Sequence, residues 1–370
     1  MIKSPNLIFF FHKSLKSIDG QTKYVQGLLS AISSIFNVIV PSEEFFDSNK
    51  AKFKHWSSRV IGVNMFLLHW IIKNHGTLKS DIGLFVMEDR YVLIPSILLA
   101  LGFRVKMISR LSDWGQEYVS SIKLRSKTLG LLFSLYEIIY ASVVLNLSSK
   151  FIVPSEFLRS QIQQYSAKEV AIFPYCPVGV KFAETEKTDR VNCYNIGRHE
   201  IYCLMVGNYE YAPNIDAANY ILEDLASRLV ELDNSIKIVI VGHKSKEQFG
   251  SLQIPNVEVE GEIQNMEPIY TKCHIGINPS LSPGGTSIKN IEYLMNGLYV
   301  ISTPESALGV IETPLLIIAK RRDFLKVILQ LSNKIRLDNF KTAKEEVTKI
   351  REYYSLSIHE EEIQQFLLKP

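Results

Sequence analysis

The chain has 370 residues, of which 46% are hydrophobic, and a formal net charge of +3. A chain of this length can bury two separate apolar cores, so two domains are expected. The four cysteines show no C-x-x-C or Cys/His spacing, which argues against a metal cluster and against a disulfide framework. Cysteine usage of this kind fits a reducing cytoplasm.

The charge is unevenly distributed along the chain. Residues 1–190 hold 23 Lys and Arg against 15 Asp and Glu, a balance of +8, whereas residues 191–370 hold 18 against 23, a balance of −5. The basic half is the one more suited to an anionic surface such as a membrane. No nucleic-acid partner is expected, because the lysines are not interleaved with aromatic residues in any recognisable binding motif.

Short apolar runs in the first half predict strands. These runs cover residues 6–11, 38–40, 81–87, 105–109, 151–155 and 170–173. The first run is too short for the hydrophobic region of a signal peptide, and no small-residue cleavage site follows it. Helices are expected between the strands, which is the arrangement of a parallel α/β sheet.

Polar residues follow two of these strands, at the edge where open α/β sheets bind ligands. The loop after the first strand holds His12, Gly20 and Gln21, and the loop after the fourth strand holds Asp113. A lone histidine at a strand end is more often a structural residue than a base. Asp113 can equally form a surface ion pair with Arg110.

Residues 128–147 carry a single charge, Glu137, and by hydropathy alone they are a borderline membrane span. A span is not expected, because a carboxylate at its centre is costly in lipid. We interpret the run as a long buried helix, one face of which can lie at a membrane. A basic segment with Lys123, Arg125 and Lys127 precedes it. That segment would suit a lipid-linked acceptor, although it can equally be a solvated helix start.

Residues 184–199 are polar and unpatterned, which is typical of a linker. They separate a first domain, residues 1–183, from a second domain, residues 200–355. The remaining residues, 356–370, contain an amphipathic piece that is expected to return to the first domain. In the second domain, strands are predicted over residues 202–206, 236–241, 257–259, 274–278 and 298–303.

The most informative stretch, residues 279–304, lies between the last two of these strands. Gly284 and Gly285 allow a ligand to approach the backbone closely. Thr286 or Ser287 can cap the helix that follows. A helix start with free N–H groups is an anion site, and a diphosphate is the ligand that we expect there.

Two charged residues lie on this helix. Lys289, within the first turns, adds a full positive charge to the anion site. Glu292 follows three residues later on much the same face, where a carboxylate can accept two hydrogen bonds from a sugar diol. An ordinary crossover helix, on which Lys289 and Glu292 form a solvated pair, explains the same residues equally well.

The stretch resembles the Gly-Gly-Thr-x-x-Lys-x-x-Glu-x-x-x-x-Gly-x-x-Val-x-Ser-Thr block of GT-B glycosyltransferases of family four. The resemblance implies an α/β fold with two Rossmann-like domains that face each other across a cleft. It also implies that Glu292 holds the donor ribose and that the glycine loop and helix start meet the donor diphosphate. Many members carry a second glutamate at the position of Gly284. The chain therefore resembles the Gly-Gly-Thr subgroup, and what contacts the transferred sugar stays open.

Other loops of the second domain resemble the same family in the same order. They are the Gly-x-x-x-Tyr-x-Pro-Asn string, the turn after the second strand and the Val-x-Val-x-Gly-x-Ile segment, whose backbone would read the donor base. The resemblance thereby adds these donor-binding residues: Gly207, Asn208, Gly242, His243, Gly261, Glu262 and Ile263. Other branches hold the donor phosphates with an Arg and a Lys in the first of these loops. This chain has neither, so Lys289 is expected to be the main cation on the leaving diphosphate.

The same resemblance implies the activity. The expected reaction transfers a sugar from a nucleotide sugar to a glycan or lipid-linked acceptor, with retention, in cell-surface polysaccharide or glycoconjugate synthesis. Lys289 and Asp113 are the expected catalytic residues, and Gly20, His12 and Gln21 join Asp113 on the acceptor side. The chain contains no Asp-x-Asp pair, so neither a metal nor another cofactor is expected.

Three alternatives differ in class. A non-catalytic subunit that has kept the fold would explain Gly284 and the lysine-free loop 208–214. A sugar-nucleotide epimerase on the same fold would need paired acids around the sugar carbon, and no such pair is evident. An oxidoreductase is least expected, because no G-x-G-x-x-G follows the first strand.

Overall fold

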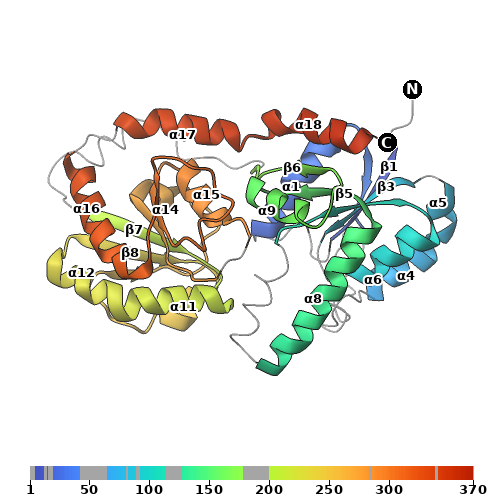
Figure 1. Cartoon of the computed structure of the whole chain (residues 1–370). Coiled ribbons are helices and arrows are strands. Elements are labelled where there is room, and N and C mark those ends of the chain that lie inside the picture. The colour runs from blue at the N-terminus through green and yellow to red at the C-terminus, as the bar shows by residue number, and fades with distance from the viewer. Residues whose placement is uncertain are drawn as a thin grey trace. The chain divides into compact units, whose positions relative to one another are not determined.

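The computed structural model describes residues 5–11, 15, 20–41, 65–80, 82–88, 92–113, 127–177, 200–282, 285–337 and 341–369. The chain divides into two compact units (Figure 1): unit 1 comprises residues 1–178 and 354–370, and unit 2 comprises residues 179–353. The predictions for His12, Gly284, the linker 184–199 and the basic residues Lys123 and Arg125 fall outside the described residues.

Unit 1 contains a six-stranded sheet in the order β2-β1-β3-β4-β5-β6. The strands are β1 (Asn6–Phe10), β2 (Asn37–Ile39), β3 (Ile82–Glu88), β4 (Lys106–Arg110), β5 (Ser148–Val153) and β6 (Val170–Ile172). All neighbouring strands are parallel, which confirms the prediction. The apolar run from Leu7 to Phe11 is completely buried, as expected for a strand covered on both faces.

Helices connect these strands and pack against the sheet. They are α1 (Gly20–Ile32), α4 (Met65–Lys73), α5 (His75–Ser80), α6 (Leu93–Ile97), the π-helix η3 (Leu98–Gly102), α8 (Lys127–Leu147), α9 (Glu156–Gln163) and α18 (Leu356–Leu368). Although α18 ends the chain, it packs on α1: the Gln364 amide donates to the Ala31 carbonyl (2.6 Å). Lys150 Nζ on β5 donates to the Phe366 carbonyl (2.8 Å) and so holds the end of α18.

Unit 2 contains a second six-stranded parallel sheet, in the order β12-β11-β10-β7-β8-β9. The strands are β7 (Ile201–Val206), β8 (Ile236–Val241), β9 (Val257–Val259), β10 (Ile275–Asn278), β11 (Tyr299–Ser302) and β12 (Leu316–Ile318). The first five confirm the predicted strands. The sixth, β12, was not predicted, because three partly exposed residues carry too little pattern to indicate a strand.

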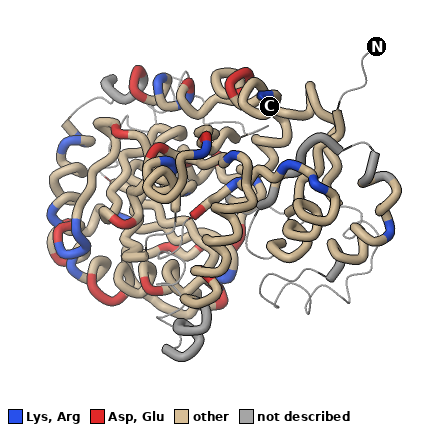
Figure 2. The backbone as a smooth tube through the Cα atoms, turned by 45° about the vertical axis from the view of Figure 1, so that its right-hand side comes forward, with Lys and Arg blue, Asp and Glu red and all other residues tan. Residues whose placement is uncertain are grey.

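The helices of unit 2 follow the same alternation. They are α11 (Ala212–Tyr220), the π-helix η4 (Ile221–Leu225), α12 (Ala226–Leu232), α13 (Ser245–Phe249), α14 (Glu267–Lys272), α15 (Ile288–Met295), the 3-10 turn η5 (Arg321–Asp323), α16 (Phe324–Leu337) and α17 (Lys341–Tyr353). Lys, Arg, Asp and Glu residues are found mainly on helices and loops (Figure 2). Among the described residues, the charged ones that are buried are Arg110, Glu137 and Lys150.

Helix α8 is present where residues 128–147 predicted a helix, and it is buried on one side only. Leu135, Ile138 and Ile139 are exposed, whereas Glu137 is only 4% exposed. The helix packs through the side that carries Glu137, and an apolar side is exposed. None of the helices described by the structure combines the length and apolar content that a membrane crossing requires.

Gly276 in β10 determines how closely α15 can approach the sheet of unit 2. A Cβ at this position would lie 2.2 Å from Cδ2 of Tyr293 in α15, so any larger residue would push the ring away. The Tyr293 ring is completely buried, and its Oη accepts a hydrogen bond from the Val206 backbone N–H (2.7 Å). Helix α15 is therefore fixed to β10 and to the end of β7.

This contact predicts the effect of an added methyl group. Gly276→Ala should lower the free energy of unfolding by about 1–3 kcal/mol, because Tyr293 must leave its position. Gly76→Ala in α5 is the matched control, since its new Cβ would meet no atom within 4 Å. Thermal denaturation measures both. A melting temperature for Gly276→Ala equal to that of the wild type would contradict this account.

Candidate functional site

The loops that follow β7, β8 and β9 are joined by backbone hydrogen bonds at the carboxyl edge of the second sheet. The Gly207 N–H donates to the Val241 carbonyl (3.0 Å), and the Tyr209 N–H donates to the His243 carbonyl (2.9 Å). The Gly242 N–H donates to the Gly261 carbonyl (3.0 Å). Three of the predicted donor loops thus lie together, at the edge where open parallel sheets bind ligands.

Gly242 makes this close approach possible. Its φ is +131°, a backbone conformation that other residues rarely adopt. A Cβ at Gly242 would also lie 2.0 Å from the carbonyl oxygen of Gly207. Glycine is therefore required at this position by the backbone alone, before any ligand is considered.

The loop between β7 and α11 is held by its two asparagines. Oδ1 of Asn208 accepts from the backbone N–H of Glu210 (2.9 Å), so this side chain is engaged within the loop. Nδ2 of Asn214 donates to the Asn208 carbonyl (3.0 Å). The predicted donor residue Asn208 therefore shapes the loop through both its side chain and its carbonyl.

His243 lies between two carboxylates. Its Nδ1 is 2.8 Å from Oε2 of Glu262, and its Nε2 is 3.8 Å from Oε1 of Glu210. All three side chains are substantially exposed, and Ile263 nearby in the chain is half-buried. His243 and Glu262 are thus brought together as direct neighbours, which the sequence did not indicate.

Ser287 occupies the N-cap position of α15, as one of the two predicted caps. Its side chain makes no hydrogen bond to the first turn of the helix. The Ser287 hydroxyl accepts instead from Nδ2 of Asn278 (3.1 Å), and the same Nδ2 also donates to Oδ1 of Asn290 (3.0 Å). Of the two predicted caps, Thr286 and Ser287, the Ser287 side chain therefore does not cap the first turn.

Lys289 is half-buried in the first turn of α15. Its Nζ donates to Oδ1 of Asn214 at 2.8 Å. Burial lowers the pKa of Lys289 to about 8, because removal from water disfavours the charged ammonium. Near neutral pH the side chain still carries a positive charge, in the first turn of α15.

Glu292 points to a different partner. Its Oε2 accepts a hydrogen bond from the Tyr270 hydroxyl (3.1 Å) in α14, and the Tyr270 ring packs edge-on against Tyr293 with the ring centroids 6.4 Å apart. The alternative in which Lys289 and Glu292 form a solvated pair does not describe this arrangement, because each has its own partner.

Two residues of this site were missed by the sequence analysis. Asn214 was part of the Pro-Asn string, but nothing in the sequence linked it to Lys289, which lies 75 residues away. Tyr270 belongs to no motif that we recognised. Both act through other side chains, and contacts of that kind become visible only in the folded chain.

The described acceptor-side residues lie at the carboxyl edge of the first sheet. Gly20 and Gln21 begin α1, and Asp113 follows β4. The Arg110 guanidinium lies 3.7 Å from the centre of the Tyr24 ring and is only 2% exposed. Burial lowers the pKa of Arg110, an effect that Tyr24 and Asp113 oppose. Arg110 interacts electrostatically with Asp113, as the alternative proposed, but it does not lie on the surface: it is a buried link between α1 and the end of β4.

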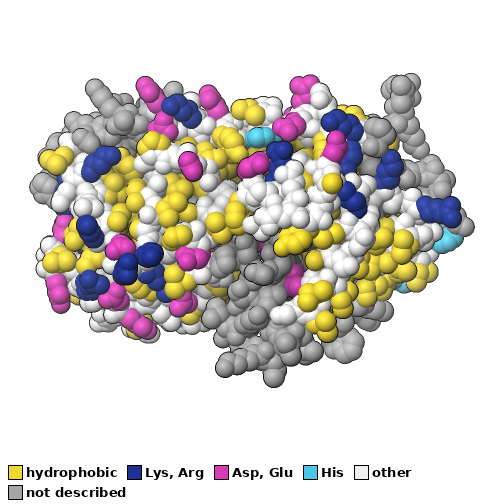
Figure 3. All heavy atoms as spheres, in the orientation of Figure 1, with side chains coloured by type: hydrophobic (Ala, Val, Ile, Leu, Met, Phe, Trp, Pro, Cys, Tyr) yellow, Lys and Arg dark blue, Asp and Glu magenta, His cyan; other side chains and the backbone are white. Residues whose placement is uncertain are grey.

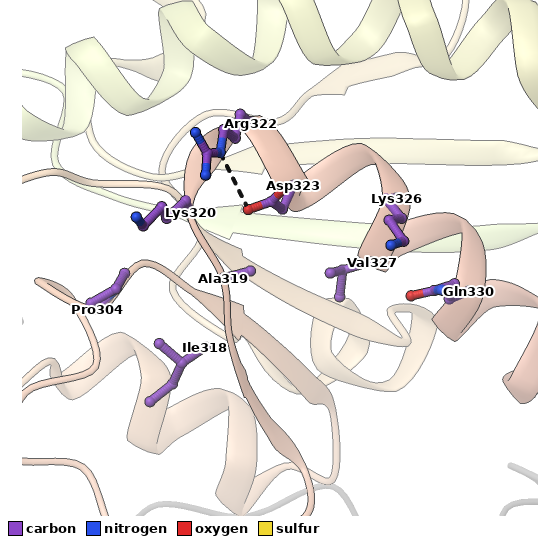
Figure 4. Close-up of a pocket in the computed structure, with 9 residues that line it drawn as sticks. All are labelled: Pro304, Ile318, Ala319, Lys320, Arg322, Asp323, Lys326, Val327 and Gln330. Atoms are coloured by element: carbon purple, nitrogen blue, oxygen red, sulfur yellow. Dashed lines mark ion pairs between the residues drawn. The ribbon is translucent and has the colours of Figure 1, made fainter.

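A cavity of about 450 Å³ lies beside the edge strand β12 (Figure 4). It is lined by Pro304, Ile318, Ala319, Lys320, Arg322, Asp323, Lys326, Val327 and Gln330. None of the predicted donor residues lines it, and β11 and β10 separate β12 from β7 in the sheet. This cavity is therefore distinct from the loops at the ends of β7, β8 and β9.

The described residues include no group of three or more His, Cys, Asp and Glu side chains placed to hold a metal ion.

Residues 200–334 match the family model described as Glycosyl transferases group 1. The match covers most of unit 2. The matched residues include the joined loops, Lys289 and Glu292. No curated protein sequence matches the chain.

Solved structures resemble the chain over almost its whole length. Sucrose-phosphate synthase from Thermosynechococcus elongatus is 16% identical, with a TM-score of 0.69 and coverage of 99% of this chain and 100% of that one. HepE of Anabaena, in complex with UDP and glucose, is 12% identical, with a TM-score of 0.67 and the same coverage. WaaG, a glycosyltransferase involved in lipopolysaccharide biosynthesis, is 13% identical, with a TM-score of 0.64 and coverage of 98% and 100%. The fold is GT-B, with two Rossmann-like domains.

The joined loops predict a local effect of Gly242→Ala. The new Cβ would collide with the Gly207 carbonyl, so the hydrogen bonds that join the loops should weaken. Hydrogen–deuterium exchange should accelerate in peptides that contain residues 207–209. Gly261→Ala is the matched control, because its Cβ would be 3.4 Å from the flexible Lys246 side chain. Equal protection in wild type and Gly242→Ala would contradict the described geometry.

Proposed function

We propose that the protein is a glycosyltransferase that moves a sugar from a nucleotide-sugar donor to a glycan or lipid-linked acceptor. The observation that carries the proposal is the start of α15, where Lys289 and Glu292 lie in a glycosyl transferases group 1 domain. Lys289 and the helix N–H groups suit a diphosphate, and Glu292 suits the ribose diol. HepE, which shares the fold, was solved with UDP and glucose.

We further propose that the transfer retains configuration and needs no metal. In this mechanism the departing nucleoside diphosphate gains negative charge, and Lys289 with the first turn of α15 stabilises it. Glu292, oriented by its hydrogen bond from Tyr270, would fix the ribose and thereby the diphosphate. Gly207, Gly242, Gly261 and their neighbours would supply backbone groups to the nucleotide. Asp113 is the proposed catalytic residue on the acceptor side.

For the acceptor, we propose a lipid-linked or cell-surface glycan reached from a membrane surface. Hydrophobic side chains gather on the part of unit 1 that carries α8, α6 and α4 (Figure 3). The exposed ones are Ile72, Ile94, Leu98, Leu101, Leu135, Ile138 and Ile139. An exposed apolar surface in the basic half of the chain, whose charge balance is +8 over residues 1–190, is suited to an anionic bilayer.

The donor proposal predicts the effect of two substitutions. Lys289→Ala and Glu292→Ala should each lower kcat/KM for the donor by about 10²–10³-fold, because each removes charge or hydrogen bonds at the leaving group or the ribose. Melting temperatures should stay close to wild type, since both side chains are only half-buried. Sugar transfer and release from nucleotide sugars are the measurements.

Lys326→Ala and Glu231→Ala are the matched controls, because both residues are exposed and lie outside the predicted site. Full activity of Lys289→Ala would exclude the proposed role. A wild-type protein that is folded yet transfers and releases no sugar from any donor would favour the non-catalytic subunit.

The membrane proposal predicts that the protein co-sediments with vesicles that contain anionic phospholipid. Ile138→Asp together with Ile139→Asp should weaken this binding on the order of tenfold, because each substitution replaces an apolar contact with a charge. Leu337→Asp is the control, since Leu337 is 85% exposed but lies in unit 2. An equal loss of vesicle binding in the control, or no loss in the double variant, would show that this surface does not bind the membrane.

A further inference from the structure

Asn214 contacts Lys289 although the two residues lie on different helices. We infer that Asn214 is a positioning residue, which holds the Lys289 ammonium at the start of α15 and leaves its charge available to the donor diphosphate. The inference rests on the proposed function, because a nucleoside diphosphate is the ligand that the ammonium would meet. It gives a residue of α11 a defined role in the site.

The orientation of the Asn214 amide is fixed at both ends. Nδ2 donates to the Asn208 carbonyl (3.0 Å), and Oδ1 accepts from Nζ of Lys289 (2.8 Å). Only in this orientation does the amide NH₂ face the carbonyl of Asn208, an acceptor, while the amide oxygen faces the ammonium of Lys289, a donor. The reverse orientation would place NH₂ against the ammonium, so the loop carbonyl and the lysine together select one rotamer.

Gly207 provides the space that Asn214 occupies. A Cβ at Gly207 would lie 3.2 Å from Cγ of Asn214 and 3.3 Å from its Nδ2, closer than ordinary van der Waals contact. The first glycine of the donor loops therefore has a second role besides its hydrogen bond to Val241. It lets the amide lie against the loop and reach across to Lys289.

A neutral partner suits a cation that must bind an anion. An ammonium has three N–H donors, and Asn214 takes one of them without cancelling the charge. A carboxylate at the same place would form an ion pair with Lys289 and compete with a diphosphate for it. Asparagine thus fixes the direction of the side chain and preserves its electrostatic attraction for phosphate.

The neutral partner also has a consequence for pH. Burial, and not a charged partner, is the cause that sets the shift among the described residues: it lowers the pKa of Lys289 to about 8. Diphosphate binds the ammonium and not the amine, so affinity should be highest below pH 8 and should decline as the pH rises through that value. An aspartate at position 214 would raise the pKa of Lys289 and move this decline to higher pH.

Two substitutions at position 214 distinguish the effect of a charged partner from the effect of losing the contact that positions Lys289. Asn214→Asp keeps the shape and adds a charge, whereas Asn214→Ser stays neutral but is too short to hold Lys289. Asn219→Asp adds the same charge elsewhere on α11 and is the matched control. Circular dichroism and melting temperature establish that each variant is folded.

The first readout is the affinity for the nucleotide that binds the wild type among UDP, GDP, ADP and dTDP, measured by calorimetry from pH 6.5 to 9.5, a range of about three pH units chosen around the Lys289 pKa. At pH 7 both Asn214 variants should bind about tenfold more weakly. Only Asn214→Asp should raise the pH at which nucleotide affinity declines, by about one pH unit. Asn219→Asp should match the wild type.

The second readout needs no ligand. In protein labelled with ¹³C-lysine, the Cε signal of Lys289, assigned by its loss in Lys289→Met, reports the titration directly. A wild-type Lys289 that titrates as in Asn214→Asp, or variants that bind nucleotide as the wild type does, would overturn the inference while the proposed function stands. A wild type that binds none of the four nucleotides would overturn the proposed function, and the donor role of Asn214 with it.

Discussion

The contact between the Tyr293 ring and Gly276 determines where α15 lies in unit 2. A side chain at Gly276 would displace the ring, and the ring carries the hydroxyl that accepts the Val206 N–H. Because Lys289 and Glu292 stand on the same helix, their positions relative to the ends of β7 and β10 depend on this packing. A buried core contact thus sets the geometry of a polar site, which is why such sites are precise when they rest on rigid elements.

The electrostatic arrangement follows from that geometry. Burial lowers the pKa of Lys289, whose Nζ donates to the Asn214 amide, and Glu292 accepts a hydrogen bond from the Tyr270 hydroxyl. Keeping a partly buried ammonium away from water costs stability. A bound diphosphate would offset that free-energy cost, so anion binding should stabilise the site. Residues of this kind, with a perturbed pKa near a helix start, mark functional sites more often than structural ones.

Much of the fold could be predicted from the sequence, because β-branched runs such as residues 236–241 indicate buried parallel strands whatever their neighbours. The strand β12 could not, since three partly exposed residues carry no periodicity. For α8, composition indicated a helix but not which of its sides would pack against the rest of unit 1. At the site, Lys289 and Glu292 were predicted from local spacing, whereas Asn214 and Tyr270 contact them from other helices. A cap was expected at Thr286 or Ser287, but the Ser287 hydroxyl instead accepts a hydrogen bond from Asn278, a partner that lies nine residues earlier and that local spacing did not indicate.

The central claim, that unit 2 binds a nucleotide-sugar donor through the start of α15, is tested most directly by thermal shift. The purified protein would be heated with UDP, GDP, ADP and dTDP sugars, each with and without EDTA, and sugar release would be measured in parallel. The account predicts stabilisation by one nucleotide class, undiminished by EDTA and accompanied by slow sugar release. The absence of a shift with every donor would contradict it.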